Sequence, residues 1–297
     1  MTTSVPRHLA VELPGLSVAA LTWGPPDGPL ALCLHGFPDT AWSWRHVGPA
    51  LAADGWRVVA PFSRGYAPTS LAPDGCYQTG ALVSDVVALH GAFGGDDRAL
   101  LVGHDWGALT AYGVGGFAPD LFARIVAMSV PPIPTFQRVL RGRRGAVLGL
   151  RQLRRSWYIL ANQVPGLPER VLPALVRRLW SAWSPGYVAT ADLRHVADAL
   201  PAGPRRTAAL RYYRSFAQPW QRSSVYRAEQ QAVLGVPRAP VLYLHGEQDG
   251  CLLPDLGRAS GGDLASGSRV RLIPGAGHFL QLEQPDLVHA EIARFAR

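Results

Sequence analysis

The sequence contains no lysine, so all 29 of its basic residues are arginine. A coding sequence rich in G and C is a sufficient explanation for this bias. Cysteine is scarce too, and an odd count of three does not make a disulfide framework. No apolar run reaches the ~18 residues that a transmembrane helix needs, and the first residues lack the apolar segment of a signal peptide. We therefore predict a cytoplasmic protein with no membrane partner.

Hydrophobic residues, in contrast, make up 48% of the 297 residues. That share is ample for a sizeable core, so global disorder is excluded. The 32 glycines and 26 prolines show no collagen-like period. The length allows two domains, although α/β folds often run well past ~200 residues as one.

Short apolar runs alternate with helical patterns in two separate parts of the chain. The strand-like runs are continuously apolar, which is typical of a parallel sheet covered on both faces. Residues 16–23 look different and predict part of an antiparallel edge. The expected strands cover 30–35, 56–61, 98–103, 122–128, 240–245 and 269–274, and the expected helices cover 41–54, 79–93, 108–117 and 285–297.

Between these two parts, residues 133–226 show helical patterning and no convincing strand. We predict an α/β protein with a mostly parallel, doubly wound sheet, built from residues 1–132 and 227–297, and an inserted helical cap over 133–226. The charge supports this division. The cap has 16 arginines against three acidic residues, a net charge of +13, and the rest has 13 against 18, a net charge of −5.

The arginines of the cap have several possible uses. No nucleic-acid-binding motif accompanies them, so no nucleic-acid partner is predicted. Solvated helix faces, some paired with the acidic core, are the favoured interpretation, and a preference for anionic substrates is a smaller possibility.

Gly103-His104-Asp105-Trp106-Gly107 lies between a buried strand and a helix. This matches the turn that presents a nucleophile in hydrolases, with Asp105 where esterases carry serine. Small residues suit both glycine positions because the turn is tight. A carboxylate is also favoured at the start of a helix, where backbone N–H groups point toward it. A plain turn with a capping aspartate is the alternative for this motif taken alone.

Two later residues favour a catalytic turn. Asp249 follows the strand that ends at His245, and His278 follows the strand that ends near residue 273. Nucleophile, acid and histidine in this order, each just past the end of a strand, are typical of a hydrolase triad. Glu247 and Asp255 are the rival acids.

At these residues the chain resembles the epoxide hydrolases of the α/β-hydrolase fold, relatives of the haloalkane dehalogenases. The resemblance rests on the segments His35-Gly-Phe-Pro-Asp39, Trp42-Ser-Trp-Arg45, Arg64-Gly-Tyr66, GHDWG at 103–107 and GAGHFLQLEQP at 275–285. It extends into the cap through Ser156-Trp-Tyr158 with the following Gln163–Glu169 segment, and through Tyr212-Tyr-Arg214. Ala161-Asn162 and Ser63 depart from the family pattern without touching the chemistry.

The resemblance implies a catalytic set of Asp105, His278, Asp249, Tyr158 and Tyr213. Asp105 opens the epoxide, the two tyrosines protonate the ring oxygen, and His278 with Asp249 activates the water that hydrolyses the ester. Tyr212 competes with Tyr213, because neighbours on a helix point about 100° apart; Tyr187 and Tyr226 are weaker candidates. The fold implies an oxyanion hole from the backbone N–H groups of two residues, Phe37 and Trp106.

No cofactor or metal is expected. The expected partners are an epoxide and water, and the chain is a monomer or a homodimer. The predicted pocket wall is apolar, with Trp180 and Trp220 as further wall candidates beside His35, Pro38, Trp157, Trp183 and Phe279.

Alternative functions use the same aspartate. A haloalkane dehalogenase needs a second side-chain N–H donor, and Phe37 stands where that family often has it. A fluoroacetate dehalogenase needs an arginine where Trp106 stands. A non-catalytic ligand-binding member of the fold is the third alternative. No serine occupies the turn, which excludes a serine esterase, and metal hydrolysis has little support because no cluster shows ligand spacing.

Overall fold

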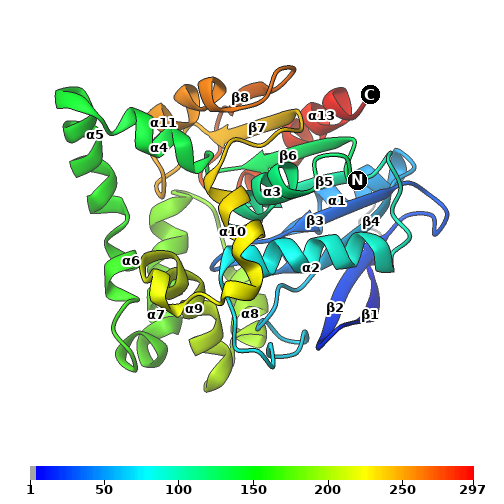
Figure 1. Ribbon diagram of the computed structural model, residues 1–297, viewed down its shortest axis with the longest axis horizontal. Coiled ribbons are helices and arrows are strands. Elements are labelled where there is room, and N and C mark those ends of the chain that lie inside the picture. The colour runs from blue at the N-terminus through cyan, green and yellow to red at the C-terminus, as the bar shows by residue number, and fades with distance from the viewer. Residues whose placement is uncertain (1–4) are drawn as a thin grey trace.

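An eight-stranded sheet forms the centre of the computed structural model, which describes residues 5–297 (Figure 1). The strand order is β1-β2-β4-β3-β5-β6-β7-β8. β2 is antiparallel to both of its neighbours, and the strands from β4 to β8 run parallel. The strands are β1 (Arg7–Leu13), β2 (Leu16–Trp23), β3 (Leu30–Leu34), β4 (Arg57–Pro61), β5 (Leu100–His104), β6 (Arg124–Met128), β7 (Val241–Gly246) and β8 (Arg269–Ile273).

The predicted α/β fold with a mostly parallel sheet is confirmed. β3, β5 and β7 are buried over their whole length, as continuously apolar strands covered on both faces must be. The antiparallel edge expected at residues 16–23 is β2, but the outer strand β1 was not predicted. Leu9, Val11 and Leu13 alternate along β1, so the sequence does carry a strand pattern there, although six of the seven residues of this edge strand are not buried.

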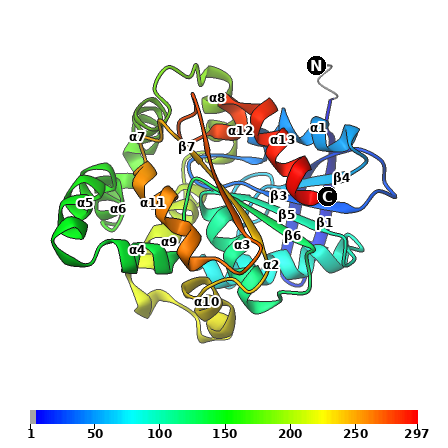
Figure 2. The ribbon, with the colours of Figure 1, turned by 90° about the horizontal axis from the view of Figure 1, so that it is seen from above.

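Helices cover both faces of the sheet (Figure 2). α1 and α13 contact each other on one face, and α2, α3 and α10 pack together on the other. The α-helices outside the segment between β6 and β7 are α1 (Val47–Ala53), α2 (Thr79–Ala92), α3 (Trp106–Phe117), α11 (Pro254–Ala259), α12 (Leu280–Glu283) and α13 (Pro285–Ala296).

The single helix predicted over residues 41–54 is wrong. The segment forms a short 3₁₀ turn, Ala41–Trp44, and then α1 begins at Val47. The hydroxyl of Thr40 accepts a hydrogen bond from the backbone of Trp42 at the start of the 3₁₀ turn. Arg45, at the break, reaches across to the carboxylate of Asp192. The break therefore places Arg45 in contact with Asp192, in the helical segment between β6 and β7.

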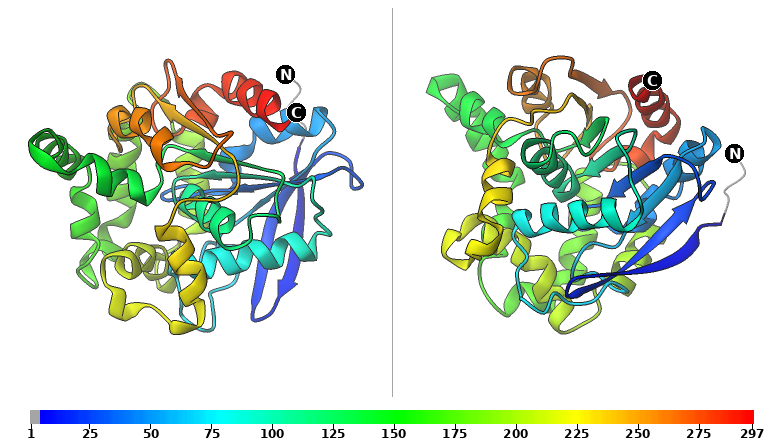
Figure 3. Two further views of the ribbon diagram at one scale, coloured as in Figure 1. Left: turned by 45° about the horizontal axis from the view of Figure 1, so that its top comes forward. Right: turned by 45° about the vertical axis from the view of Figure 1, so that its right-hand side comes forward.

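Helices, and no strand among the described residues, fill the chain between β6 and β7 (Figures 1 and 3). The last of them, α10, packs against α2 and α3 and so belongs to the layers of the sheet. The cap limits of 133 and 226 stay a prediction. The helices are α4 (Ile133–Val139), α5 (Gly142–Arg155), α6 (Trp157–Ala161), α7 (Leu167–Trp183), α8 (Thr190–Ala199), α9 (Pro204–Ala217) and α10 (Arg227–Leu234).

Within residues 5–297, no helix is long and apolar enough to cross a bilayer. The prediction of no signal peptide concerns the start of the chain, and residues 1–4 lie outside the described residues. The cytoplasmic location stays a prediction.

Candidate active site

Asp105 occupies a sharp turn between the end of β5 and the start of α3. Its backbone has φ 54° and ψ −114°, a conformation that residues other than glycine rarely adopt. Both glycines of the turn are needed for space. A Cβ on Gly103 would lie 2.1 Å from the carbonyl oxygen of Gly107, and one on Gly107 would lie 2.5 Å from that of Leu34. The turn therefore holds the carboxylate at the carboxyl end of the central strand.

The carboxylate of Asp105 points at the loop that follows β3. Its Oδ1 accepts a hydrogen bond of 2.7 Å from the backbone N–H of Phe37. Gly36 makes this approach possible, because a Cβ there would lie 2.3 Å from the same oxygen. The second predicted donor residue, Trp106, is the first residue of α3. The backbone N–H of Phe37 therefore contacts the Asp105 carboxylate, and the backbone N–H of Trp106 belongs to the next residue in the sequence.

His278 lies between two carboxylates. Its Nδ1 is 3.0 Å from Oδ2 of Asp249, and its Nε2 is 3.8 Å from Oδ2 of Asp105. The other oxygen of Asp249 accepts hydrogen bonds from the backbone of Cys251 (2.6 Å) and Leu252 (3.0 Å). All three side chains are buried or nearly so. The fold therefore brings together the aspartate, acid and histidine that the sequence indicated.

The rival acids lie elsewhere. Glu247 is exposed at the surface. Asp255 is about half-exposed and lies 3.5 Å from Arg258. The carboxylates beside His278 are those of Asp249 and Asp105.

The two carboxylates control the protonation of His278. Burial by itself lowers the pKa of this histidine, but the negative charges of Asp249 and Asp105 outweigh it and raise the pKa to about 10. Burial acts to raise the pKa of Asp249, and the imidazolium of His278 reverses this, so the pKa of the acid is lowered. An ionised Asp249 beside a protonated His278 is the stable pair.

A cavity of about 320 Å³ opens above the Asp105 carboxylate. Its wall combines residues of the core with residues of the segment between β6 and β7. Its lining is mostly apolar with a few polar side chains, among them Asp105, Tyr158 and Tyr213, as is common for ligand sites in proteins. The lining residues are Asp105, Trp106, Leu109, Val130, Ile133, Phe136, Gln152, Ser156, Tyr158, Ile159, Tyr213, Phe216, Cys251 and Leu252.

Tyr158 and Tyr213 both reach this cavity and contact each other. Their rings meet edge to face with centroids 5.5 Å apart, and the ring of Tyr213 also packs on Phe37 and Trp106. The hydroxyl of Tyr158 lies 3.7 Å from the sulfur of Cys251. The hydroxyl of Tyr213 is buried and makes no hydrogen bond of normal geometry to another described residue.

Burial raises the pKa of both phenols well above the ordinary value, and the negative charge of Asp105 adds to the effect. Both hydroxyls therefore keep their protons at neutral pH and remain hydrogen-bond donors.

The competing tyrosines are occupied with other partners. Tyr212 turns away from the cavity and donates to the carbonyl oxygen of Arg64 at 2.8 Å. Tyr187 donates to Asp192, and Tyr226 donates to Asp74. Of the tyrosines weighed from the sequence, the structure brings Tyr158 and Tyr213 to Asp105.

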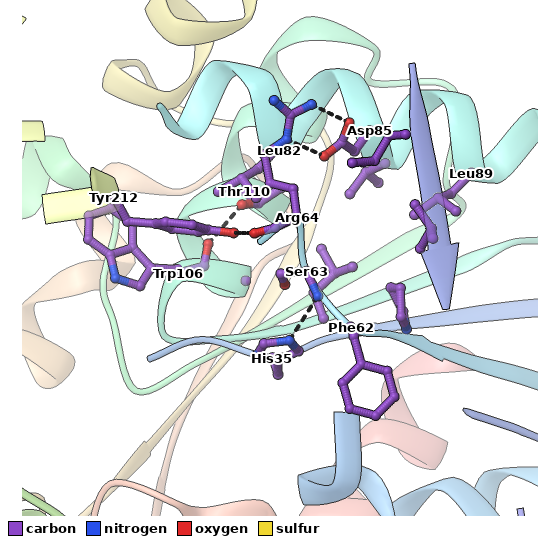
Figure 4. Close-up of a pocket in the computed structure, with 16 residues that line it drawn as sticks. His35, Phe62, Ser63, Arg64, Leu82, Asp85, Leu89, Trp106, Thr110 and Tyr212 are labelled. Carbon is purple, nitrogen blue, oxygen red and sulfur yellow. Dashed lines mark hydrogen bonds and ion pairs between the residues drawn. The ribbon is translucent and has the colours of Figure 1, made fainter. Parts of the chain in front are cut away.

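The predicted pocket wall needs correction, because none of its five residues lines this cavity. His35 lines a separate, small cavity of about 30 Å³, which shares Trp106 with the larger one (Figure 4). There its Nε2 accepts a hydrogen bond from the backbone of Ser63 at 2.9 Å. Figure 4 also shows Tyr212 pointing at the carbonyl of Arg64, whose guanidinium pairs with Asp85.

Of the other four predicted wall residues, Pro38, Trp183 and Phe279 form a layer behind the site, and Trp157 lies at the surface. The carbonyl of Pro38 accepts from the indole of Trp180, whose ring stacks on Phe279 at 3.6 Å. The ring of Trp183 lies edge to face on His278, with centroids 4.8 Å apart. Trp157 is 39% exposed and lies under the guanidinium of Arg178. Trp220, a further candidate, is 80% exposed.

The structure also shows contacts that sequence reasoning missed. The carbonyl of Trp183, at the end of α7, accepts 3.0 Å hydrogen bonds from the backbone of both Gly250 and His278. Ser184 adds its hydroxyl as an acceptor for the N–H of His278. These are contacts between main-chain atoms or with a small hydroxyl, so no motif signals them.

A second set of missed contacts comes from α5. The amide of Gln152 donates to the carbonyl of Cys251 and accepts from the N–H of Leu253. Arg155 donates to the carbonyl of Asp249 at 2.6 Å. Helix α5 therefore holds the loop that carries the acid.

Comparison with known proteins agrees with this geometry. Residues 29–285 match the family model described as "alpha/beta hydrolase fold". Epoxide hydrolase A of Mycobacterium tuberculosis is 30% identical, over 98% of this chain and 97% of that protein. Among solved structures, a putative epoxide hydrolase from Klebsiella pneumoniae superposes with a TM-score of 0.84 at 23% identity, covering 98% of this chain and 97% of the other.

Epoxide hydrolase A of Mycobacterium thermoresistibile superposes with a TM-score of 0.76 at 26% identity and covers 98% of both chains. The full-length matches and the arrangement around Asp105 lead to the same assignment. This chain belongs to the epoxide hydrolase family of the α/β-hydrolase fold.

Proposed function

We propose that this protein converts an epoxide to a vicinal diol through an ester on Asp105. The observation that carries the proposal is the shared cavity, in which the Asp105 carboxylate and the hydroxyl-bearing rings of Tyr158 and Tyr213 line one mostly apolar space. A carboxylate beside two protonated phenols suits an electrophile whose leaving oxygen stays attached to the carbon skeleton.

In the first step an oxygen of Asp105 attacks one ring carbon, and the carbon–oxygen bond of the epoxide breaks. The ring oxygen takes a proton from a phenol as its charge develops, because an alkoxide is a strong base. The products are a β-hydroxyalkyl ester of Asp105 and a tyrosinate, which regains its proton later in the cycle. Tyr213 has a buried hydroxyl free of other normal hydrogen bonds, which favours it as a donor.

In the second step water hydrolyses the ester. Neutral His278 takes a proton from water, the resulting hydroxide attacks the ester carbonyl, and Asp249 stabilises the imidazolium. The backbone N–H of Phe37, already 2.7 Å from Asp105 Oδ1, is placed to stabilise the oxyanion, with that of Trp106 as its proposed partner. The acyl carbon–oxygen bond of the ester breaks while the alkyl carbon–oxygen bond stays intact. The departing alkoxide takes a proton from the His278 imidazolium, and the diol leaves with one oxygen from Asp105. The proton on the new Asp105 carboxyl group returns to the tyrosinate, which restores the starting site.

The charges link the two steps. While Asp105 is ionised it helps to raise the pKa of His278. Esterification removes that charge, so the pKa of His278 falls when the neutral base is needed. The site thereby holds His278 protonated before alkylation and releases its proton afterwards.

A single turnover in water labelled with heavy oxygen tests the covalent route. The label is expected in the Asp105 side chain, with the first diol carrying unlabelled oxygen from Asp105. Label that appears directly in the diol, with Asp105 unlabelled, contradicts the proposal. A His278→Gln variant is expected to accumulate the ester, visible as a mass increase on the Asp105 peptide. A halide-release assay serves as the test for dehalogenase activity.

A further inference from the structure

Helix α5 has its apolar and polar sides reversed. Gln152 is buried, whereas Val147, Leu150 and Leu153 are 61%, 66% and 54% exposed. A helix on the surface of a globular protein normally turns its apolar side chains toward the core. The reversal means that the apolar side of α5 is available to a partner outside the chain.

The exposed apolar surface continues along the chain into α6 and α7. We call the whole set the cap patch. Figures 1, 2 and 3 agree that α5 and α6 lie at the end of the molecule opposite β1 and α13. A hollow of about 380 Å³ is lined by several of its members. The cap patch consists of Val147, Leu150, Leu153, Trp157, Leu160, Val164, Leu167 and Val171, all exposed.

Basic residues surround this surface and acidic residues are missing from it. Residues 142–168 contain no Asp or Glu, and the first acid beyond them, Glu169, is paired with Arg214. Asp192, another of the three acids between 133 and 226, is paired with Arg45. Exposed arginines lie on α5 beside its apolar residues; they are Arg143, Arg144, Arg151 and Arg154.

This charge distribution decides between partners. Two copies that met through the cap patch would bring arginines against arginines, which opposes a homodimer at this surface. A bilayer of anionic lipids fits both the apolar residues of the cap patch and the arginines around it. Apolar and aromatic side chains enter the boundary between headgroups and acyl chains, and arginines contact the headgroup phosphates.

We propose that the cap patch docks on an anionic phospholipid bilayer, with α5 lying in the plane of the interface. Such docking needs no apolar run of transmembrane length. The prediction of no membrane partner rested on the lack of such a run, and it did not consider a helix that lies on the surface.

Docking through the cap patch brings the cavity above Asp105 close to the bilayer. Gln152 of α5, Ile159 of α6 and Ser156 between these helices line the cavity above Asp105, and both helices carry part of the patch. One thin layer of helix therefore separates the lipid from the cavity. An apolar epoxide that concentrates in a bilayer then enters beside the protein. This route of entry rests on the proposed function, whereas the docking itself does not.

Vesicle sedimentation tests the docking without any epoxide. Wild-type protein is expected to bind vesicles of phosphatidylcholine with about 30 mol % phosphatidylglycerol, and to bind pure phosphatidylcholine vesicles far more weakly. The variant L150E/L153E is expected to lose about tenfold or more of the partition coefficient. The control L9E/L287E makes the same charge change at two other exposed leucines, in β1 and α13, which are 40% and 43% exposed, and is expected to bind like wild type.

A second variant tests the charge contribution. R151Q/R154Q is expected to weaken binding about fivefold for each arginine removed, and added salt is expected to weaken wild-type binding. Thermal unfolding and diol formation from a water-soluble epoxide show that each variant is folded.

Three results overturn the docking. They are equal binding to charged and uncharged vesicles, unchanged binding by L150E/L153E, and a concentration-dependent dimer that L150E/L153E abolishes. Protein that binds vesicles but forms no diol supports the docking and contradicts the proposed function instead.

Discussion

At the scale of single residues, the position of a hydroxyl separates Tyr213 from its neighbour. Tyr213 lines the cavity above Asp105 and has a buried hydroxyl, and Tyr212 donates its hydroxyl to the carbonyl of Arg64. The sequence could narrow the choice to these two, because only one of two adjacent helical residues faces the pocket. Helix spacing alone could not decide which, since the answer depends on how α9 is rotated against the core, and the choice of Tyr213 came from the family resemblance.

We therefore expect Tyr213→Phe to slow ring opening and Tyr212→Phe to leave it close to wild type. Loss of a general acid typically costs about 10²–10⁴-fold, and the second tyrosine, Tyr158, is expected to bring the loss to the lower end of that range. Tyr212→Phe removes one buried hydrogen bond, worth about 1 kcal/mol of stability. Single-turnover alkylation rates and thermal unfolding measure the two effects. Equal slowing in both variants would contradict the assignment.

The charge of Asp105 is a second property of a single residue. Replacing it with asparagine removes one of the two anions beside His278 and is expected to lower the pKa of His278 below about 10. Titration of the His278 imidazole by NMR in wild type and Asp105→Asn measures the shift. An unchanged or higher pKa in the variant would show that Asp105 does not stabilise the imidazolium.

The raised pKa of His278 also makes the free energy of unfolding depend on pH. The folded pKa of His278, about 10, is above its ordinary value of 6.5. Its contribution to the free energy of unfolding is therefore complete below about pH 6.5 and is lost as the pH rises toward about 10. Denaturant unfolding at a series of pH values, compared with His278→Gln, measures this loss.

At the scale of elements, the strands were well predicted and the helix ends less so. Apolar runs identified the five strands from β3 to β7, because a strand covered on both faces needs apolar residues nearly throughout. The edge strand β8 was identified although Arg269 and Arg271 alternate with its apolar residues and are exposed. The break after Trp44 went unseen because a side-chain cap and a long-range ion pair produce it. The cavity wall was predicted poorly for a related reason. Residues such as Ile133 and Phe136 reach it through the placement of α4, which no local pattern encodes.

Close packing of the nucleophile turn gives the prediction at this scale. Gly107→Ala is expected to destabilise the protein by about 1–3 kcal/mol and to displace Asp105, because the new Cβ would lie 2.5 Å from the Leu34 carbonyl. Gly91→Ala in α2 is the control. Its Cβ meets nothing within 4 Å, so we expect a gain of about 0.5–1 kcal/mol. Chemical denaturation measures both. A destabilising Gly91→Ala, or a neutral Gly107→Ala, would be inconsistent with this packing.

At the scale of the whole molecule, the net charge of +8 conceals two regions of opposite sign. Residues 133–226 carry +13 and the remainder carries −5. The predicted pairing between cap and core occurs in part. Arg138 binds Asp263, and the reverse pair, a core arginine with a cap acid, is Arg45 with Asp192. Other arginines, including Arg151 and Arg154, stay exposed.

The unequal charge predicts a salt effect that depends on the substrate. The positive potential of the 133–226 segment should raise the encounter rate of an anionic epoxide, and salt screens such fields with a Debye length of about 10 Å at 0.1 M. We expect kcat/KM for a carboxylate-bearing epoxide to fall with added salt, and kcat/KM for a neutral analogue of similar size to stay constant. Parallel salt dependence for both substrates would exclude steering.

The hydrogen bonds to the Trp183 carbonyl limit where this fold can be divided. One oxygen atom holds the backbone of both Gly250 and His278, so the loops of the acid and the base are joined through a residue of the inserted segment. Packing leaves little slack there, since a Cβ on Gly250 would lie 1.9 Å from the carbonyl of Ala182. The insertion is therefore not a module that can be excised or exchanged at its two ends. A chimaera that takes the helices of a relative must take its 249–251 and 276–279 loops as well, or the Asp249 and His278 loops will lose the carbonyl that joins them.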